Sequence, residues 1–151
     1  MLFRSAYRSD AQRWGIPDFW ATPLELIGQG AGDCEDFAVA KYFALKNLGV
    51  ATSRLKLMYA RTANKSAGHV VLAYYPGAGA EPFILDNENT NIVPLSQRRD
   101  LHVIYGFNTI GVWRMAGRTR PHWAGSSNRL RNWWRLMRRH HLQEPSLQER
   151  A

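Results

Sequence analysis

The chain has 151 residues and a single cysteine, Cys34, so it can form no internal disulfide. A zinc centre that uses two or more thiolate ligands is excluded for the same reason. No run of apolar residues approaches the roughly 18 that a membrane-spanning helix needs. Residues 1–8 also lack the apolar stretch of a secretory signal sequence. A chain of this length can bury about two-thirds of its surface in one domain, so it needs no cross-link to hold a core.

Acidic residues are scarce in the last quarter of the chain. Residues 1–113 carry 11 Lys and Arg against 10 Asp and Glu, whereas residues 114–151 carry 9 Arg against 2 Glu. Residues 114–151 therefore carry +7 of the net charge of +8. An electrostatic argument for binding nucleic acid or an anionic membrane applies to that segment alone.

Turn and capping residues predict helices in the first third of the chain. A short polar helix is predicted up to about residue 14, with Tyr7 among its core contacts. Thr22 is typical of the N-cap of a second short helix, which the glycines at 28–32 would end. The clearest helix is predicted from about Cys34 to Leu48, because apolar residues recur there at near-helical spacing.

Strands are predicted to follow these helices, at residues 54–60, 69–75, 82–86 and 103–105, with a loop at 87–100. The turn sequence Pro76–Gly79 indicates that the second and third strands form an antiparallel hairpin. Trp113 is expected to close the sheet, and Ser126–Leu142 has the pattern of an amphipathic helix. Strands gathered after N-terminal helices predict an α+β domain at residues 1–125, with a basic C-terminal helix and tail at 126–151.

Cys34 is a candidate nucleophile. Its predicted position at a helix N-terminus favours the thiolate, because unpaired backbone amides stabilise negative charge. His69 begins one strand of the predicted hairpin and Asp86 ends the other, at equal distances from the midpoint of the turn. A tight turn would place them directly opposite each other, with Cβ atoms about 5 Å apart, and a longer turn would keep them at the same end. Separately these three residues have ordinary structural roles; together they favour a nucleophile, a base and an orienting group.

Three acids surround the candidate thiol: Asp33, Glu35 and Asp36. Their negative charges should raise the pKa of Cys34 and make the thiolate harder to form. Two explanations are open on these grounds. The carboxylates either cap the helix and face water, or their oxygens hold a hard cation, for which calcium suits an irregular oxygen-rich site better than magnesium.

Four sequence blocks resemble the bacterial transglutaminase-like cysteine peptidases of the LapG type. They are Asp18–Glu25 (DFWATPLE), Gly32–Phe43 (GDCEDFAVAKYF), Gly68–Leu72 (GHVVL) and Leu85–Asn87 (LDN). The similarity spans about residues 10–115 in the same order and spacing, and the GDCED block is highly specific. It implies a papain/transglutaminase-like fold with Cys34 as nucleophile, His69 as base and Asp86 as orienting residue.

The resemblance also implies calcium dependence, with Asp33 and Glu35 as ligands and Asp36 as a weaker candidate. Members are periplasmic and cleave large surface adhesins, and a membrane receptor that responds to cyclic-di-GMP can sequester the enzyme and preserve the biofilm. They carry a signal peptide and further helices upstream of the segment that matches Arg4–Trp14. We therefore expect a core that is truncated at its N-terminus relative to the family.

Trp20 is a candidate for the oxyanion hole, because transglutaminase-like enzymes can use a tryptophan there, beside the backbone amide of Cys34. The structural alternative is a core aromatic. In the C-terminal helix, Leu130, Trp133, Trp134 and Met137 form one apolar stripe. We expect this stripe to dock on the domain. The alternatives are that the arginines and tryptophans bind a nucleic acid or an anionic membrane.

The sequence thus predicts a calcium-dependent cysteine endopeptidase that acts through a thioester on a protein substrate, with no nucleic acid as partner. Two alternatives belong to other classes. The same triad permits acyl transfer to an amine, and the shortened N-terminus with its basic tail is compatible with a catalytically silent binding module.

Overall fold

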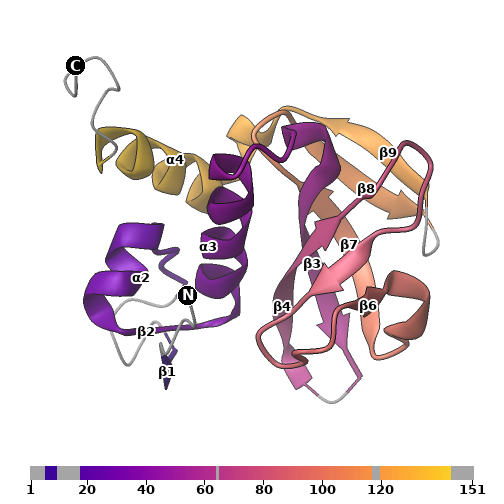
Figure 1. Cartoon of the computed structure of the whole chain (residues 1–151), viewed down its shortest axis with the longest axis horizontal. Coiled ribbons are helices and arrows are strands. Elements are labelled where there is room, and N and C mark those ends of the chain that lie inside the picture. Colours follow the sequence, from indigo (N-terminus) through magenta and orange to yellow (C-terminus); the bar gives the residue numbers. More distant parts are fainter. Residues whose placement is uncertain (1–5, 10–17, 64, 117–119, 144–151) are drawn as a thin grey trace.

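The computed structural model describes residues 6–9, 18–63, 65–116 and 120–143. Its helices lie on one side and a large sheet on the other, with one helix between the two (Figure 1). The helices are α2 (Pro23–Gln29), α3 (Cys34–Asn47) and α4 (Arg131–Gln143). None of the described helices is long and apolar enough to cross a membrane.

The described sheet is antiparallel, in the order β6–β5–β4–β3–β7–β8–β9. Its strands are β3 (Leu55–Thr62), β4 (Lys65–Tyr74), β5 (Phe83–Leu85), β6 (Val93–Pro94), β7 (Leu101–Phe107), β8 (Val112–Ala116) and β9 (Arg120–Gly125). A separate parallel pair joins β1 (Ala6–Tyr7) to β2 (Ala31–Gly32). The predicted α+β class is confirmed.

Local capping explains where the first two described helices begin and end. Thr22 Oγ1 accepts the N–H of Glu25, and the Glu25 carboxylate accepts the N–H of Thr22 in return. Gly30 ends α2 in the left-handed region, at φ 65°, which only glycine adopts without strain. Gly49 follows α3 with φ 94°. The predicted bounds of both helices are therefore close to the observed ones.

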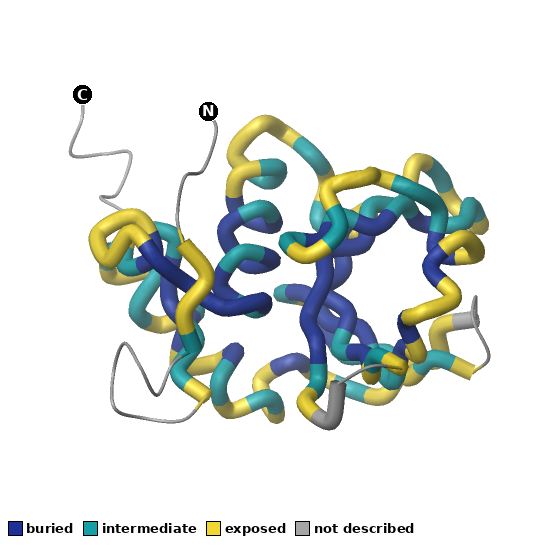
Figure 2. Tube along the Cα trace, turned by 90° about the horizontal axis from the view of Figure 1, so that it is seen from below, coloured by how far each residue is buried: buried dark blue, intermediate teal, exposed yellow. Residues whose placement is uncertain are grey.

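Helix α3 supplies the centre of the main core. Its buried side chains, among them Val39, Tyr42 and Phe43, pack against β3 and β4 residues such as Leu57 and Leu72. Figure 2 shows buried residues concentrated in the middle of the molecule and exposed ones in the peripheral loops. A second cluster, which includes Met58, Val71 and Leu95, covers the other face of the same strands. That is why β3 is buried on both faces and not half-buried as its alternating sequence predicts.

Several predicted elements are wrong in detail. Residues Ala6–Tyr7 form a strand and not a helix, and Tyr7 is 59% exposed, because the segment pairs with β2. The rest of the predicted first helix lies largely outside the described residues. Strand β7 is longer than predicted, since it pairs with both β3 and β8. Strand β9 was not predicted at all; its sequence carries Pro121, which a strand tolerates at an edge.

Helix α4 docks on the domain and begins later than predicted, because Ser127–Arg129 form a 3-10 turn that Ser126 caps. Trp133 makes edge contacts with the rings of Tyr42 and Phe107, at centroid distances of 5.7 and 5.3 Å. Trp134, predicted on the same stripe, is 42% exposed, and Leu136 takes the buried position. The helical rotation thus places one of the two tryptophans in the core.

This packing predicts different costs for the two tryptophans. Trp133→Ala should lower the free energy of unfolding by about 3 kcal/mol or more, because a buried ring leaves a cavity. Trp134→Ala, on the exposed side of the same helix, should change it by about 0.5 kcal/mol or less. Urea denaturation of the two variants measures both values. Equal small losses would show that α4 contributes no core contact.

Candidate active site

The site is built at a free edge of the sheet. Strand β5 pairs only with residues 72–74 of β4, so the described part of β4 before Leu72 has no strand beside it on that edge. The backbone groups of β4 point alternately to its two neighbours, and Tyr75 N–H donates toward β3, to Arg54 O. Val70 lies an odd number of residues before Tyr75, so its N–H points the other way, to the free edge. That N–H donates to the sulfur of Cys34, at the first residue of α3.

The side chains of His69 and Asp86 form a direct hydrogen bond. Their side chains meet at 2.8 Å between Nε2 and Oδ1, and both residues are buried. They are not directly opposite, as a tight turn would make them. The register pairs Leu72 with Leu85, so the continued ladder places Asp86 opposite Val71, two residues beyond His69. The turn is longer than two residues, and a shift of two keeps both side chains on one face.

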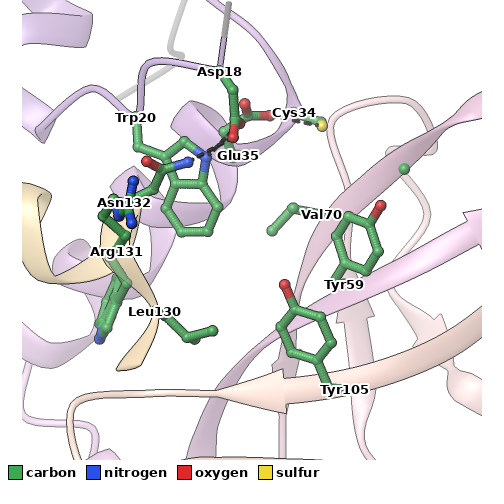
Figure 3. Close-up of a pocket in the computed structure, with 12 residues that line it drawn as sticks. Asp18, Trp20, Cys34, Glu35, Tyr59, Val70, Tyr105, Leu130, Arg131 and Asn132 are labelled. Carbon is green, nitrogen blue, oxygen red and sulfur yellow. Dashed lines mark hydrogen bonds between the residues drawn. The ribbon is translucent and has the colours of Figure 1, made fainter. Parts of the chain in front are cut away.

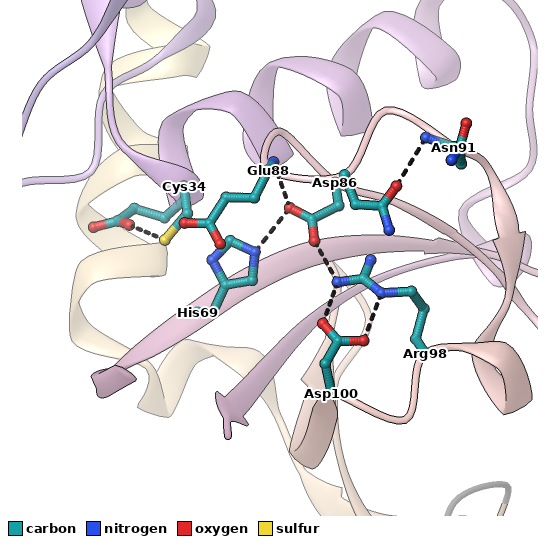
Figure 4. A network of polar contacts seen from close by, with 9 residues as sticks. Cys34, His69, Asp86, Glu88, Asn91, Arg98 and Asp100 are labelled. Atoms are coloured by element: carbon teal, nitrogen blue, oxygen red, sulfur yellow. Dashed lines mark hydrogen bonds and ion pairs between the residues drawn. The ribbon is translucent and has the colours of Figure 1, made fainter. Parts of the chain in front are cut away.

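The geometry leaves one nitrogen of His69 for the nucleophile. Nε2 is bonded to Asp86, and Figure 4 shows the other ring nitrogen, Nδ1, directed to the side where the sulfur of Cys34 lies. The N–H of Val70, the residue after His69 in β4, bonds the sulfur of Cys34, so the sulfur lies close to His69 along the strand. The structure therefore brings together the three residues that the sequence proposed for a triad.

The surroundings of Cys34 favour the neutral thiol over the thiolate. Burial raises the pKa of Cys34, and the adjacent Glu35 carboxylate raises it further through its charge and a hydrogen bond. The thiol donates that bond to Glu35 Oε2 at 3.1 Å. The Val70 N–H acts in the opposite direction but is the weaker influence. The neighbouring acids thus raise the pKa of Cys34 as the sequence predicts, and burial adds to their effect.

The three acids around the thiol have different roles. Asp36 is 1% exposed, and its two oxygens accept the backbone N–H groups of Ala21 and Asp33, at 2.8 and 3.2 Å. It therefore caps α3 and ties the segment before α2 to it. Gly32 is needed beside this cap, because a Cβ there would lie 2.4 Å from Leu26 Cδ1. Capping thus accounts for Asp36, and it leaves the bond from Glu35 to the thiol unexplained.

Asp33 and Glu35 are the carboxylates that could hold a metal ion. No group of three or more His, Cys, Asp and Glu side chains gathers as a metal centre in the part of the chain that the structure describes. The two side chains do share a hydrogen bond, and burial raises the pKa of Glu35. Two adjacent carboxylates that are partly withdrawn from water fit calcium, provided that backbone carbonyls and waters complete its shell of 6–8 oxygens.

A cavity of about 730 Å³ opens beside the thiol. Figure 3 shows the rings of Trp20, Tyr59 and Tyr105 around it, with Cys34 at one end. Tyr59 and Tyr105 stack at 5.2 Å. The side chain of Tyr59 also packs over Gly68, the residue before His69, because a Cβ at Gly68 would lie 2.2 Å from the Tyr59 hydroxyl. The cavity is large enough for several residues of an extended polypeptide.

Trp20 lies at this cavity but its indole N–H is already engaged. It donates to Asp18 Oδ1 at 3.0 Å, and the ring stacks on Phe107 at 5.7 Å. Trp20 therefore packs against the core, as the structural alternative predicts, and it also lines the space beside Cys34, where its role toward an oxyanion stays a prediction. A role toward an oxyanion requires the indole to exchange Asp18 for the substrate oxygen.

Arg98 belongs to this site although the sequence did not indicate it. Residues 87–100 were predicted only as a polar loop, yet the guanidinium of Arg98 reaches Asp86 Oδ2 at 2.8 Å and is 4% exposed as a residue. Asp100 holds the same guanidinium with both carboxylate oxygens. The spacing Arg98-x-Asp100 was visible in the sequence, but nothing there indicated that the loop turns back to Asp86.

Comparison with known proteins agrees with this site. A family model for bacterial transglutaminase-like cysteine proteinases matches residues 4–105. The chain belongs to this family. It is therefore a cysteine peptidase, and the predicted transglutaminase-like peptidase fold is confirmed. No curated protein sequence matches it.

Solved structures of LapG from Legionella pneumophila resemble the chain over most of its length. The EGTA-treated form is 38% identical, with a TM-score of 0.79, and covers 91% of this chain and 73% of LapG. The calcium-bound form is 38% identical, with a TM-score of 0.76 and the same coverage. A third LapG structure is 37% identical at a TM-score of 0.78, covering 91% and 72%.

The bonds to Asp86 predict an acid-dependent stability. Burial by itself would raise the pKa of Asp86, but hydrogen bonds from His69, from the N–H of Glu88 and from Arg98 lower it to about 2. Because the pKa of Asp86 is lower in the folded protein, this residue stabilises the fold at a pH above about 4, the ordinary pKa of an aspartate. The contribution is lost as the pH falls toward 2. It amounts to about 2 kcal/mol. Denaturation of wild type and Asp86→Asn from pH 6 to pH 2 should show the difference between them shrinking in that window; parallel curves would contradict it.

Proposed function

We propose that the chain is a calcium-dependent endopeptidase in which Cys34 is the nucleophile, His69 the base and Asp86 the orienting residue. The bond of 2.8 Å between His69 Nε2 and Asp86 Oδ1, at the sheet edge where Val70 holds the Cys34 sulfur, carries this proposal. A thiol, an imidazole and a carboxylate in this order are what nucleophilic acyl transfer requires.

Each residue then has a defined task. His69 Nδ1 takes the proton of Cys34, and the thiolate attacks a peptide carbonyl to give a tetrahedral oxyanion. The collapse of this oxyanion breaks the C–N bond and leaves a thioester, while the imidazolium gives its proton to the departing amine. The same imidazole next activates the water that hydrolyses the thioester. Asp86 keeps the ring in the orientation and tautomer that these transfers need.

Glu35 must release the thiol before this sequence can begin. Its bond to the sulfur and its charge both raise the pKa of Cys34 and so disfavour the thiolate. Asp33 and Glu35 would hold calcium, and the bound ion would supply positive charge that offsets theirs. The backbone amide of Cys34 and the indole of Trp20 are the donors proposed for the oxyanion.

The substrate that we propose is a large surface adhesin, cleaved in the periplasm. The support is the family and the identity of 37–38% to LapG over 91% of the chain, together with a cavity beside Cys34 that can admit an extended segment. A membrane receptor that responds to cyclic-di-GMP is the proposed inhibitory partner, on the same similarity. Control of biofilm would follow from these two interactions.

The nucleophile can be tested without ambiguity, because the chain has one cysteine. Cys34→Ser should abolish cleavage of an N-terminal adhesin fragment, since a hydroxyl is far harder to ionise than a thiol. The variant should unfold at the wild-type temperature. Iodoacetamide should inactivate the wild type in proportion to the label that mass spectrometry finds. Undiminished cleavage by Cys34→Ser would exclude the proposed mechanism.

The products of the reaction separate hydrolysis from acyl transfer. Cleavage in the presence of an added primary amine should give a free carboxylate at the new C-terminus. An amide of the added amine as the main product would identify a transferase. Binding of the adhesin fragment without any cleavage, with an unreactive thiol, would identify a silent binding module.

Calcium dependence has its own test. EGTA should abolish cleavage, calcium should restore it, and magnesium should do so poorly, because magnesium requires a tighter octahedral shell. Calorimetry on metal-free protein should show calcium binding that Asp33→Asn and Glu35→Gln each weaken by about tenfold or more. Glu81 lies before β5, at the end of that strand away from Asp86. The variant Glu81→Gln is therefore the matched control and should bind calcium normally. Full activity in EGTA with no heat of binding would refute the site.

A further inference from the structure

Arg98 lies behind the proposed triad, on the side of Asp86 away from His69. It follows the 3-10 turn Leu95–Gln97, in the segment between β6 and β7. Its Nη2 donates to Asp86 Oδ2 at 2.8 Å, and the side chain is 5% exposed where that of Asp86 is fully buried. Figure 4 shows the continuous chain of contacts from Asp100 through Arg98 and Asp86 to His69.

Three hydrogen bonds hold the carboxylate of Asp86 in one orientation. Oδ1 accepts from His69 Nε2 and from the N–H of Glu88, at 2.8 and 3.0 Å. Oδ2 accepts from Arg98. Turning the carboxylate about its Cβ–Cγ bond would break bonds to both oxygens at once. Without Arg98, Oδ2 would be a buried oxygen that has lost its hydrogen-bond donor among the described residues, and the carboxylate could turn to find another.

Arg98 is itself held in place. Its Nε and Nη2 donate to the two oxygens of Asp100, at 2.9 and 2.7 Å, in a fork that only a guanidinium can make. The side chain of Asp100 is half exposed, whereas the Arg98 contact to Asp86 is withdrawn from water. A buried charge-assisted bond is stronger than an exposed one, so the contact to Asp86 is the one that the surroundings reinforce.

We propose that Arg98 is a positioning residue of the active site, which fixes the carboxylate of Asp86 and through it the ring of His69 that faces Cys34. The role rests on the proposed triad. Arg98 touches neither the thiol nor the cavity, so it acts on the reaction only through Asp86. The purely structural alternative is that Arg98 merely anchors the segment between β6 and β7 to the sheet.

A double-mutant cycle separates these two roles. Arg98→Met should lower kcat for cleavage of the adhesin fragment by roughly tenfold or more with KM little changed, because orientation of the base matters for the chemical step and not for binding. In an Asp86→Asn background the same substitution should lower kcat less than about twofold, since its route to His69 is already broken. Arg98→Lys keeps the charge without the fork and should recover part of the loss.

Arg99→Met is the matched control, because Arg99 is the exposed neighbour of Arg98 and should leave kcat unchanged. All variants are compared at calcium saturation and after a thermal melt. If Arg98→Met does not fold, Arg98→Lys is carried through the same cycle. An equal loss of kcat in both backgrounds would overturn the role of Arg98 while the triad stands. An unchanged kcat in Asp86→Asn would overturn the triad, and the role of Arg98 with it.

Discussion

The early end of β5 is the constraint on which the site depends. If β5 continued beyond Leu85, its backbone would occupy the edge of β4 and take the N–H of Val70. Because it stops, the N-terminus of α3 reaches that edge and places Cys34 beside the residue after His69. The chain turns away at the same point, so Asp86 is free to bond the imidazole. One truncated strand thus brings three segments of the sequence together.

Two carboxylates within this site act in opposite directions. Asp86 is fully buried, yet the donors around it favour its charged form, so it can orient and stabilise an imidazolium. Glu35 is also largely withdrawn from water, but its partner is the thiol, and its charge keeps that thiol protonated. The geometry thus joins His69 to Asp86, while burial and Glu35 raise the pKa of the Cys34 thiol. A cation at Asp33 and Glu35 is the proposed means of relieving this.

Helix α4 shows how the basic segment can serve the fold. Trp133 and Leu136 enter the core beside α3, and Arg139 donates to Glu25 and to the carbonyl of Trp20. The helix therefore supports the segment that carries Trp20 at the edge of the cavity. Arg131, at the start of α4, lines the cavity beside Cys34, whereas Arg135 is exposed and Arg138 lies over the exposed ring of Trp134. Part of the charge excess therefore serves packing through Arg139, and part of it lies at the cavity through Arg131.

The sequence by itself determined the local features whose causes are local. The cap at Thr22, the glycines that end the helices and the strand-forming sequences of β3 and β4 depend on neighbouring residues, so the positions of these elements could be predicted. The pairing of His69 with Asp86 could be predicted because a hairpin keeps its two ends together whatever the turn length. Only the tertiary structure decided the register of that hairpin, the strand at Ala6–Tyr7, the burial of Trp133 over Trp134, and the bond from Arg98 to Asp86. These depend on the packing of segments far apart in the chain, where a difference of a fraction of a helical turn or of two residues in a loop changes the contact.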